Sequence, residues 1–168
     1  MLFHTDQQDN PLETLADLKA ARRGDARAFA RLVATHQALV YSLSYRVFGD
    51  EQAAVEAAQA GVSQAAQNIV TFRGGQFNLW LLQWVVAACR EHLRTGAPGR
   101  AAPGSPAEPH TVQVLQSSLC CLPLNLRMAL ILVDVMGLEY GQAAAVLGAP
   151  REQVALWLAQ ARARLVTP

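Results

Sequence analysis

The C-terminal stretch from Gly137 to Leu165 carries two apolar stripes at helical spacing, with a break between them at Gly148 and Pro150. Because glycine favours the end of a helix, we expect two helices joined by a short turn. The stripes consist of Tyr140, Ala143, Ala144 and Leu147, then Val154, Leu158, Ala161 and Leu165. Such a pair is either a helix-turn-helix, whose second helix usually enters the DNA major groove, or an αα-hairpin in a helical bundle. Spacing alone does not distinguish the two.

A segment rich in proline and glycine, from Thr95 to Thr111, divides the rest of the chain. It holds four prolines and three glycines, a composition typical of a linker that cannot bury a core. We therefore expect an all-α fold with two small helical domains, residues 12–95 and 111–166, joined by a flexible linker at 96–110. The two domains should be loosely placed relative to each other.

The N-terminal half contains further helical patterns, with natural N-cap residues at Asp25 and Asp50. The segment from Glu51 to Asn68 is mostly Ala and Gln, and Gly61 in its middle should cost the helix about 1 kcal/mol. From Phe77 to Leu93 the chain is largely apolar on all sides, which predicts a helix in the interior of the domain.

Composition excludes several classes of function. The net charge of +1 is low for a protein that binds nucleic acid, which normally presents a basic face. Cys89, Cys120 and Cys121 form no C-x-x-C pair and are expected to be small buried residues. The four histidines are scattered, so we expect no metal and no cofactor. No nucleophile elbow, P-loop or other catalytic arrangement is visible, and we do not expect an enzyme.

No apolar run approaches the roughly 18 residues that span a bilayer. The N-terminus also lacks the pattern of a signal peptide. We therefore expect a cytoplasmic protein without a membrane partner.

Several runs of residues point to one family. In the C-terminal half they are Leu122, Pro123, Arg127, Gly137, Leu138, Tyr140, Ala144, Leu147, Gly148, Val154, Leu158, Ala161, Arg162, Arg164 and Leu165. In the N-terminal half they are GDARAFARLV at 24–33, TFRGG at 71–75 and F..WL at 77–81. In this order they resemble regions 4 and 2 of the extracytoplasmic-function (ECF) sigma factors, which are small bacterial members of the sigma-70 family. The resemblance implies two helical domains, of which the second contains a helix-turn-helix.

The resemblance also implies partners. In the family, an acidic helix of region 2 binds a coiled coil on the clamp of core RNA polymerase. At the corresponding positions this chain keeps long polar side chains only at Glu51, Glu56 and Gln59. Alanine, valine and glycine replace most of the acidic and aromatic residues. Because single interface anchors can each contribute about 2 kcal/mol or more, tight binding through this face would need another source of energy.

The positions that touch DNA in the family are altered in the same way. The promoter-melting helix has Gln83, Val86 and Ala87 where the family carries Arg, Arg and Asn, and Trp80 and Trp84 are expected to be core residues. On the recognition helix the residues implied to contact DNA are Arg151, Gln153, Trp157, Gln160, Arg162 and Arg164. Three arginine–phosphate contacts would give a salt slope of about −2.7, which predicts weakened contacts with promoter DNA.

Leu156 and Trp157 stand side by side near the groove-facing side of the recognition helix. They form either a protein-contact patch or a surface that another helix of this chain covers. Two functions follow from the resemblance. The first is a divergent sigma factor that directs RNA polymerase to promoters in transcription initiation. The second is a sigma-like binding module, such as a decoy for an anti-sigma factor, and a drifting copy without function is a third alternative. The shared order of both regions favours the first.

Overall fold

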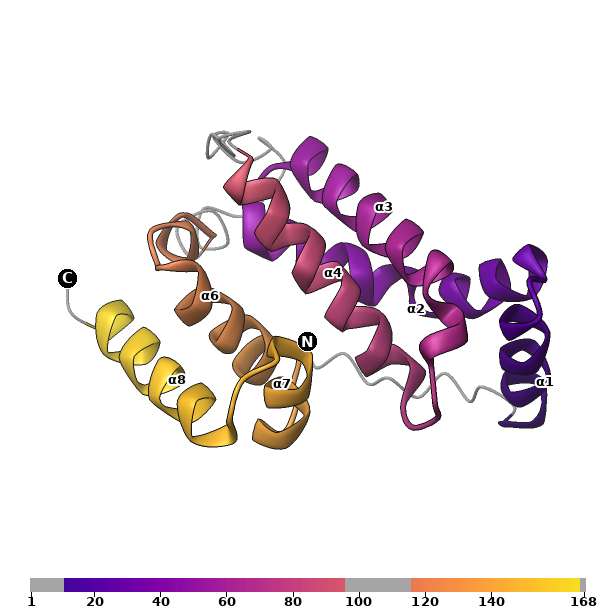
Figure 1. Cartoon of the computed structure of the whole chain (residues 1–168). Coiled ribbons are helices and arrows are strands. Elements are labelled where there is room, and N and C mark those ends of the chain that lie inside the picture. The colour runs from indigo at the N-terminus through magenta and orange to yellow at the C-terminus, as the bar shows by residue number, and fades with distance from the viewer. Residues whose placement is uncertain (1–10, 96–115, 167–168) are drawn as a thin grey trace.

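The computed structural model describes residues 11–95 and 116–166, and every regular element in these ranges is helical (Figure 1). The N-terminal domain contains α1 (Pro11–Arg22), α2 (Ala26–Phe48), α3 (Glu51–Gln67), the short 3-10 helix η1 (Ile69–Thr71) and α4 (Phe77–Arg94). The C-terminal domain contains a helical turn at 116–120, α6 (Leu124–Leu130), the π-helical η2 (Ile131–Val135), α7 (Tyr140–Leu147) and α8 (Arg151–Val166). The prediction of an all-α fold is confirmed.

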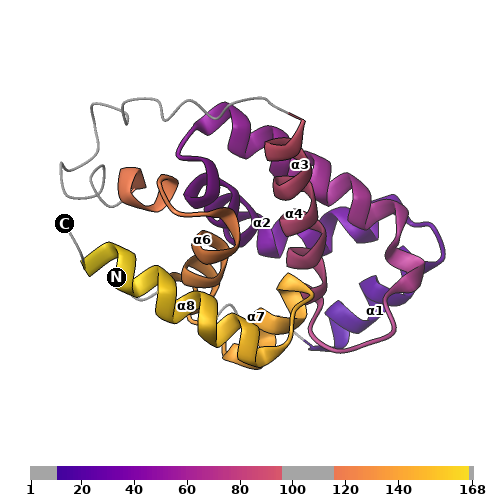
Figure 2. The same ribbon diagram turned by 60° about the vertical axis from the view of Figure 1, so that its left-hand side comes forward.

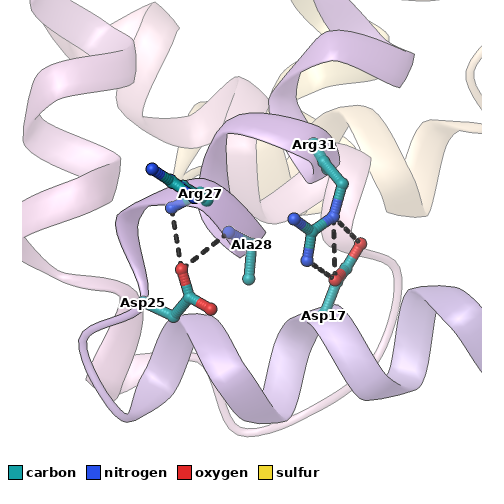
Figure 3. A network of polar contacts seen from close by, with 5 residues as sticks. All are labelled: Asp17, Asp25, Arg27, Ala28 and Arg31. Atoms are coloured by element: carbon teal, nitrogen blue, oxygen red, sulfur yellow. Dashed lines mark hydrogen bonds and ion pairs between the residues drawn. The ribbon is translucent and has the colours of Figure 1, made fainter.

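The helix ends follow the predicted capping residues. The Asp25 carboxylate accepts hydrogen bonds from the backbone N–H groups of Arg27 and Ala28, at 2.9 and 3.1 Å (Figure 3). Asp50 caps α3 in the same way, accepting from the N–H of Ala53 at 2.8 Å. These side chains satisfy backbone donors that have no partner inside the helix, so both helices begin where the sequence predicts.

Gly61 has a packing role that the sequence did not show. A Cβ atom at this position would lie 2.7 Å from Cα of Val85 and 3.0 Å from its backbone nitrogen. The missing side chain therefore lets α3 and α4 cross at close range. The expected loss of helix propensity at Gly61 is the cost of this contact, rather than a sign of a weak helix.

Helix α4 is the central element of the molecule. Leu81, Leu82, Val85 and Val86 are fully buried, and α4 packs against α2 and α3 within its own domain and against α7 of the other domain. Figures 1 and 2 show α4 between α3 and the C-terminal helices. Its expected position in the interior is confirmed.

The two domains are not loosely placed. One continuous hydrophobic cluster joins residues of α2, α3 and α4 to Met128, Ile131, Leu132, Val146 and Val154 of the C-terminal domain. The expectation of loose placement is therefore wrong, because apolar surface of both domains is buried in a shared core. The linker at 96–110 lies outside the described residues, and the domain boundaries stay predictions.

The cysteines differ from expectation in part. Cys89 is fully buried, whereas Cys120 is half-buried and Cys121 is exposed. Burial raises the pKa of the Cys89 thiol to about 12. The sequence could not separate these cases, because the two adjacent cysteines lie where the helical turn at 116–120 ends.

Candidate polymerase and DNA contact surfaces

The three residues predicted to bind polymerase all lie exposed on α3. Ala53, Ala54 and Ala57 form the buried side of this helix, so Glu51, Glu56 and Gln59 are left on its outer surface. The Glu56 carboxylate accepts a hydrogen bond from the Gln52 amide at 3.0 Å, and the closest nitrogen of His92 lies 4.0 Å from it. The face can therefore offer two carboxylates and two amides to a basic partner.

The promoter-melting positions on α4 are not free. Val86 is fully buried in the core, and the Gln83 amide donates a hydrogen bond to the Ala145 carbonyl of α7 at 3.1 Å. Of the three positions discussed above, Ala87 alone is exposed without such a contact. In this arrangement α7 packs against α4, the helix to which the family resemblance assigns promoter melting.

Trp80 and Trp84 belong to an aromatic cluster with Phe72 and Phe77. Neighbouring ring centroids lie 5.5 to 6.1 Å apart, mostly in edge-to-face geometry. Both tryptophans are half-buried and pack against the main core, as expected for structural residues. The indole N–H of Trp84 is buried and has no hydrogen-bond acceptor among the described residues.

Helix α8 places the predicted DNA contacts on two kinds of surface. Its buried side consists of Val154, Leu158 and Ala161, as the apolar stripe predicted, but Leu165 is 39% exposed. The predicted contact residues that are exposed are Arg151, Gln160, Arg162 and Arg164, and those that are half-buried are Gln153 and Trp157. The helix therefore presents fewer groups to a groove than its sequence implied.

Arg162 is engaged by the protein itself. Its guanidinium donates to the Asp134 carboxylate of η2 at 2.6 and 3.0 Å, and this hydrogen bonding raises the pKa of Arg162. Arg151 and Arg164 are the cations of α8 that have no ion pair among the described residues. No local sequence pattern predicts this pair, since its members are 28 positions apart and on different helices.

The structure separates the two members of the predicted protein-contact patch. Leu156 is 50% exposed, in agreement with a surface residue. Trp157 is half-buried and packs against both hydrophobic clusters of the molecule. Other helices of this chain therefore cover much of Trp157, which agrees with the second alternative. They leave Leu156 exposed, which does not.

The C-terminal end of α2 is capped by the other domain. The Arg127 guanidinium donates to the Val47 carbonyl at 2.5 Å, to Leu122 at 3.0 Å and to the Cys120 carbonyl. The Gln116 amide donates to the carbonyls of Tyr45 and Arg46, at 3.3 and 3.0 Å. The carbonyls of Tyr45, Arg46 and Val47 lie in the last turn of α2, where carbonyls lack donors from within the helix. The Tyr45 carbonyl also accepts from the N–H of the C-cap Gly49 at 2.7 Å.

The reverse contact holds the C-terminal end of α7. Arg90 of α4 donates through both terminal nitrogens to the Leu147 carbonyl at 3.2 Å, and Gln83 donates to Ala145. Each domain therefore caps a helix of the other with an arginine and an amide side chain. We call these contacts the interdomain caps. Their members are far apart in sequence, and no local pattern could have identified them.

Comparisons with known proteins agree with this architecture. The model of sigma-70 region 2 matches residues 32–97, and that of sigma-70 region 4 matches residues 113–165. The ECF RNA polymerase sigma factor SigM of Mycobacterium tuberculosis is 31% identical over 160 residues, which cover 89% of this chain and 82% of SigM. The chain belongs to the ECF sigma factors of the sigma-70 family, whose function is in transcription initiation.

Two solved structures share the fold. CnrH, in complex with the cytosolic domain of CnrY, has a TM-score of 0.70 and 25% identity, over 91% of this chain and 94% of CnrH. The sigma factor RpoE of Bartonella quintana, in complex with the anti-sigma factor NepR, has a TM-score of 0.71 and 18% identity, over 83% of this chain and 95% of RpoE. In the part of the chain that the structure describes, no helix is long and apolar enough to cross a membrane. The same residues contain no cluster of His, Cys, Asp or Glu suited to a metal.

Proposed function

We propose that this sigma factor binds core RNA polymerase through the outer face of α3 and contacts promoter DNA weakly through α8. The observation that carries the proposal is that both family regions match this chain in their usual order, and that each match coincides with a helical part of the structure. The chain acts by binding rather than by catalysis, and it works in the cytoplasm, where a bacterial polymerase transcribes.

The polymerase contact that we propose consists of Glu51, Glu56 and Gln59. Two carboxylates can guide α3 to a basic clamp surface, because opposite charges raise the association rate and fix the orientation. The apolar anchors that usually supply affinity are absent from this face of α3. Further contacts elsewhere on the chain must supply the remaining affinity.

The DNA contact that we propose on α8 consists of Arg151, Gln153, Gln160 and Arg164, with Trp157 at its margin. Arg162 joins this set only when it leaves Asp134. Two free arginines correspond to a salt slope of about −1.8, which is too shallow for stable binding by the domain alone. Binding together with polymerase compensates, because the second contact is then intramolecular.

An anti-sigma factor is a further partner that we propose. A protein with the same fold, the sigma factor RpoE of Bartonella quintana, is observed in a complex with the anti-sigma factor NepR. Leu156 offers an exposed apolar contact on α8 for one. The decoy hypothesis has no observation in its favour among the described contacts, so we keep initiation as the function.

The first test measures how tightly the purified chain binds core polymerase from the same cell, and whether the complex initiates transcription in vitro. Glu56→Lys places a like charge opposite the clamp and should reduce core binding by about tenfold or more. The control is Glu91→Lys, which reverses an exposed carboxylate on α4 and should leave core binding intact. Equal binding by both variants would mean that α3 is not the polymerase contact.

The second test concerns α8. Asp134→Asn removes the carboxylate that holds Arg162 and should steepen the salt slope of DNA binding by about 0.9, the value for one additional phosphate contact. An unchanged slope, with the protein still folded, would show that Arg162 does not face DNA.

A further inference from the structure

We propose that the corner between α1 and α2 is a second DNA-binding site, which holds backbone phosphates at the end of the N-terminal domain. Its ligands are Lys19 and Arg22 in the last turn of α1, Arg23 in the turn and Arg27 in the first turn of α2. All four side chains are exposed. We call these four residues the basic corner.

The charge of this segment differs from that of the whole chain. Residues 17–31 contain five basic and two acidic side chains, while the full chain has a net charge of only +1. Positive charge that is scarce overall is therefore concentrated in one short segment. A concentration of this kind is the electrostatic signature of a phosphate-binding surface.

The two carboxylates at the corner are already engaged (Figure 3). Asp17 accepts from Nε of Arg31 at 3.1 Å with both of its oxygens, and this hydrogen bonding holds the pKa of Asp17 below its usual range. Asp25 caps α2 through the backbone N–H groups of Arg27 and Ala28. The basic corner consequently has no ion-pair partner within the described residues, and all four of its residues are exposed.

The corner is also open enough for a phosphate to approach. Gly24, at its centre, has a φ of 96°, and no atom lies within 4 Å of the Cβ that would be built there. Ala26 and Ala30 are exposed small residues beside it. Three of the four cations are arginines, whose planar guanidinium binds phosphate oxygens in pairs.

The position of the corner makes it independent of the helix-turn-helix. Figure 1 shows α1 and α8 at opposite ends of the molecule. The region 2 match begins at residue 32 and does not include the corner. Among the exposed cations without an ion pair in the described chain, four lie at the corner, two on α8 and one, Arg73, in the turn between η1 and α4. The corner is the largest of these groups, so the larger electrostatic contribution to DNA binding comes from it.

DNA is the ligand that the observations favour over an acidic protein. The choice rests on the proposed function, in which the chain works on promoter DNA with few cations on α8. The DNA-binding measurement below requires neither polymerase nor a promoter, so its result stays valid if the proposed initiation activity fails; polymerase enters only in a separate binding assay of the same variant.

The experiment measures binding of the full chain to a labelled non-specific duplex by fluorescence anisotropy over a range of salt concentrations. The quadruple variant Lys19→Gln, Arg22→Gln, Arg23→Gln, Arg27→Gln should lower the magnitude of the salt slope by about 3.6, or about 0.9 per lost contact. The double variant Arg151→Gln, Arg164→Gln should lower it by about 1.8. Arg94→Gln, which removes an exposed arginine paired with Glu91, is the control that leaves the slope unchanged.

A slope that the quadruple variant does not change would overturn the proposal. So would a quadruple variant that binds DNA normally and loses core polymerase, because the corner would then be a protein contact. Replacing the three corner arginines by lysine should preserve the slope, since charge is retained. Thermal unfolding of each variant shows whether a loss of binding reflects a loss of the fold. If the quadruple variant does not fold, the single variant Arg23→Gln in the exposed turn decides the matter, since it should lower the magnitude of the slope by about 0.9 and an unchanged slope would overturn the proposal.

Discussion

Replacing Gly61 by alanine should destabilise the protein, although alanine is the better helix former. The new Cβ would lie 2.7 Å from Cα of Val85, and the two nearest atoms in its path belong to the α4 backbone. A flexible side chain could move aside, but a helix backbone can do so only if α3 and α4 separate. The contact is at the centre of the N-terminal core, next to the fully buried Val85.

The expected magnitude follows from two opposing effects. Alanine should gain about 1 kcal/mol in helix propensity over glycine. Overpacking of a filled core costs about 1–3 kcal/mol, and a backbone clash belongs at the upper end of that range. The net effect is a loss of about 2 kcal/mol, which for a chain of this size corresponds to a decrease in Tm of about 4–8 °C.

Gly141→Ala provides a matched control in the other domain. Gly141 is also a helical glycine, it is exposed, and no atom lies within 4 Å of its Cβ position. The substitution should therefore stabilise the protein by about 0.5 kcal/mol through propensity alone. The two variants make the same chemical change with opposite expected signs.

Circular dichroism during thermal unfolding gives the Tm of both variants, and urea unfolding gives their free energy of unfolding. A Gly61→Ala protein as stable as the wild type would refute the close approach of α3 and α4. Destabilisation by Gly141→Ala would instead show that propensity and open space do not decide the effect of a helical glycine here.

Three further predictions concern buried groups. At pH 8 a thiol reagent should modify Cys121 rapidly and spare Cys89 until the protein is unfolded, because burial raises the pKa of Cys89 to about 12; rapid native labelling of Cys89 would contradict the packing. Arg127→Leu should leave carbonyls of two domains without donors and cost about 1–3 kcal/mol, with a larger radius of gyration in X-ray scattering; unchanged stability would rule out the interdomain caps. Trp157→Ala should lower stability by about 2 kcal/mol, because the ring packs on both clusters. If Trp157→Ala is as stable as the wild type but no longer binds a protein partner, Trp157 belongs to the protein-contact patch instead.

Local features of the sequence predicted much of the fold. Asp25 and Asp50 cap helices because their interactions extend only two or three residues along the chain. The stripe of Val154, Leu158 and Ala161 is buried because its period matches the helix. These features depend on near neighbours, and near neighbours can be read from sequence.

Features that depend on distant residues were not predictable. From sequence alone Gly61 predicts a weaker helix, because its contact with Val85 joins two helices that are distant in the chain. The sequence predicts Arg162 as a free cation, because its partner Asp134 lies on another helix. Arg127 was identified only as part of a family pattern, and its role at the end of α2 appears when the two domains are packed together.

The interdomain caps also bear on how strongly the two domains are held together, an arrangement that we call the closed state. Desolvation lowers the pKa of Arg127, and its recorded acceptors are neutral carbonyls rather than a carboxylate. A guanidinium recovers favourable hydration when it leaves such a site, so the cost of burying its charge offsets part of the hydrogen-bond energy of this cap. The closed state must then depend mainly on the apolar surface shared by α4, α6 and α7. Separation of the two domains would therefore have to offset the loss of this apolar contact, while Arg90 and Arg127 would regain their hydration.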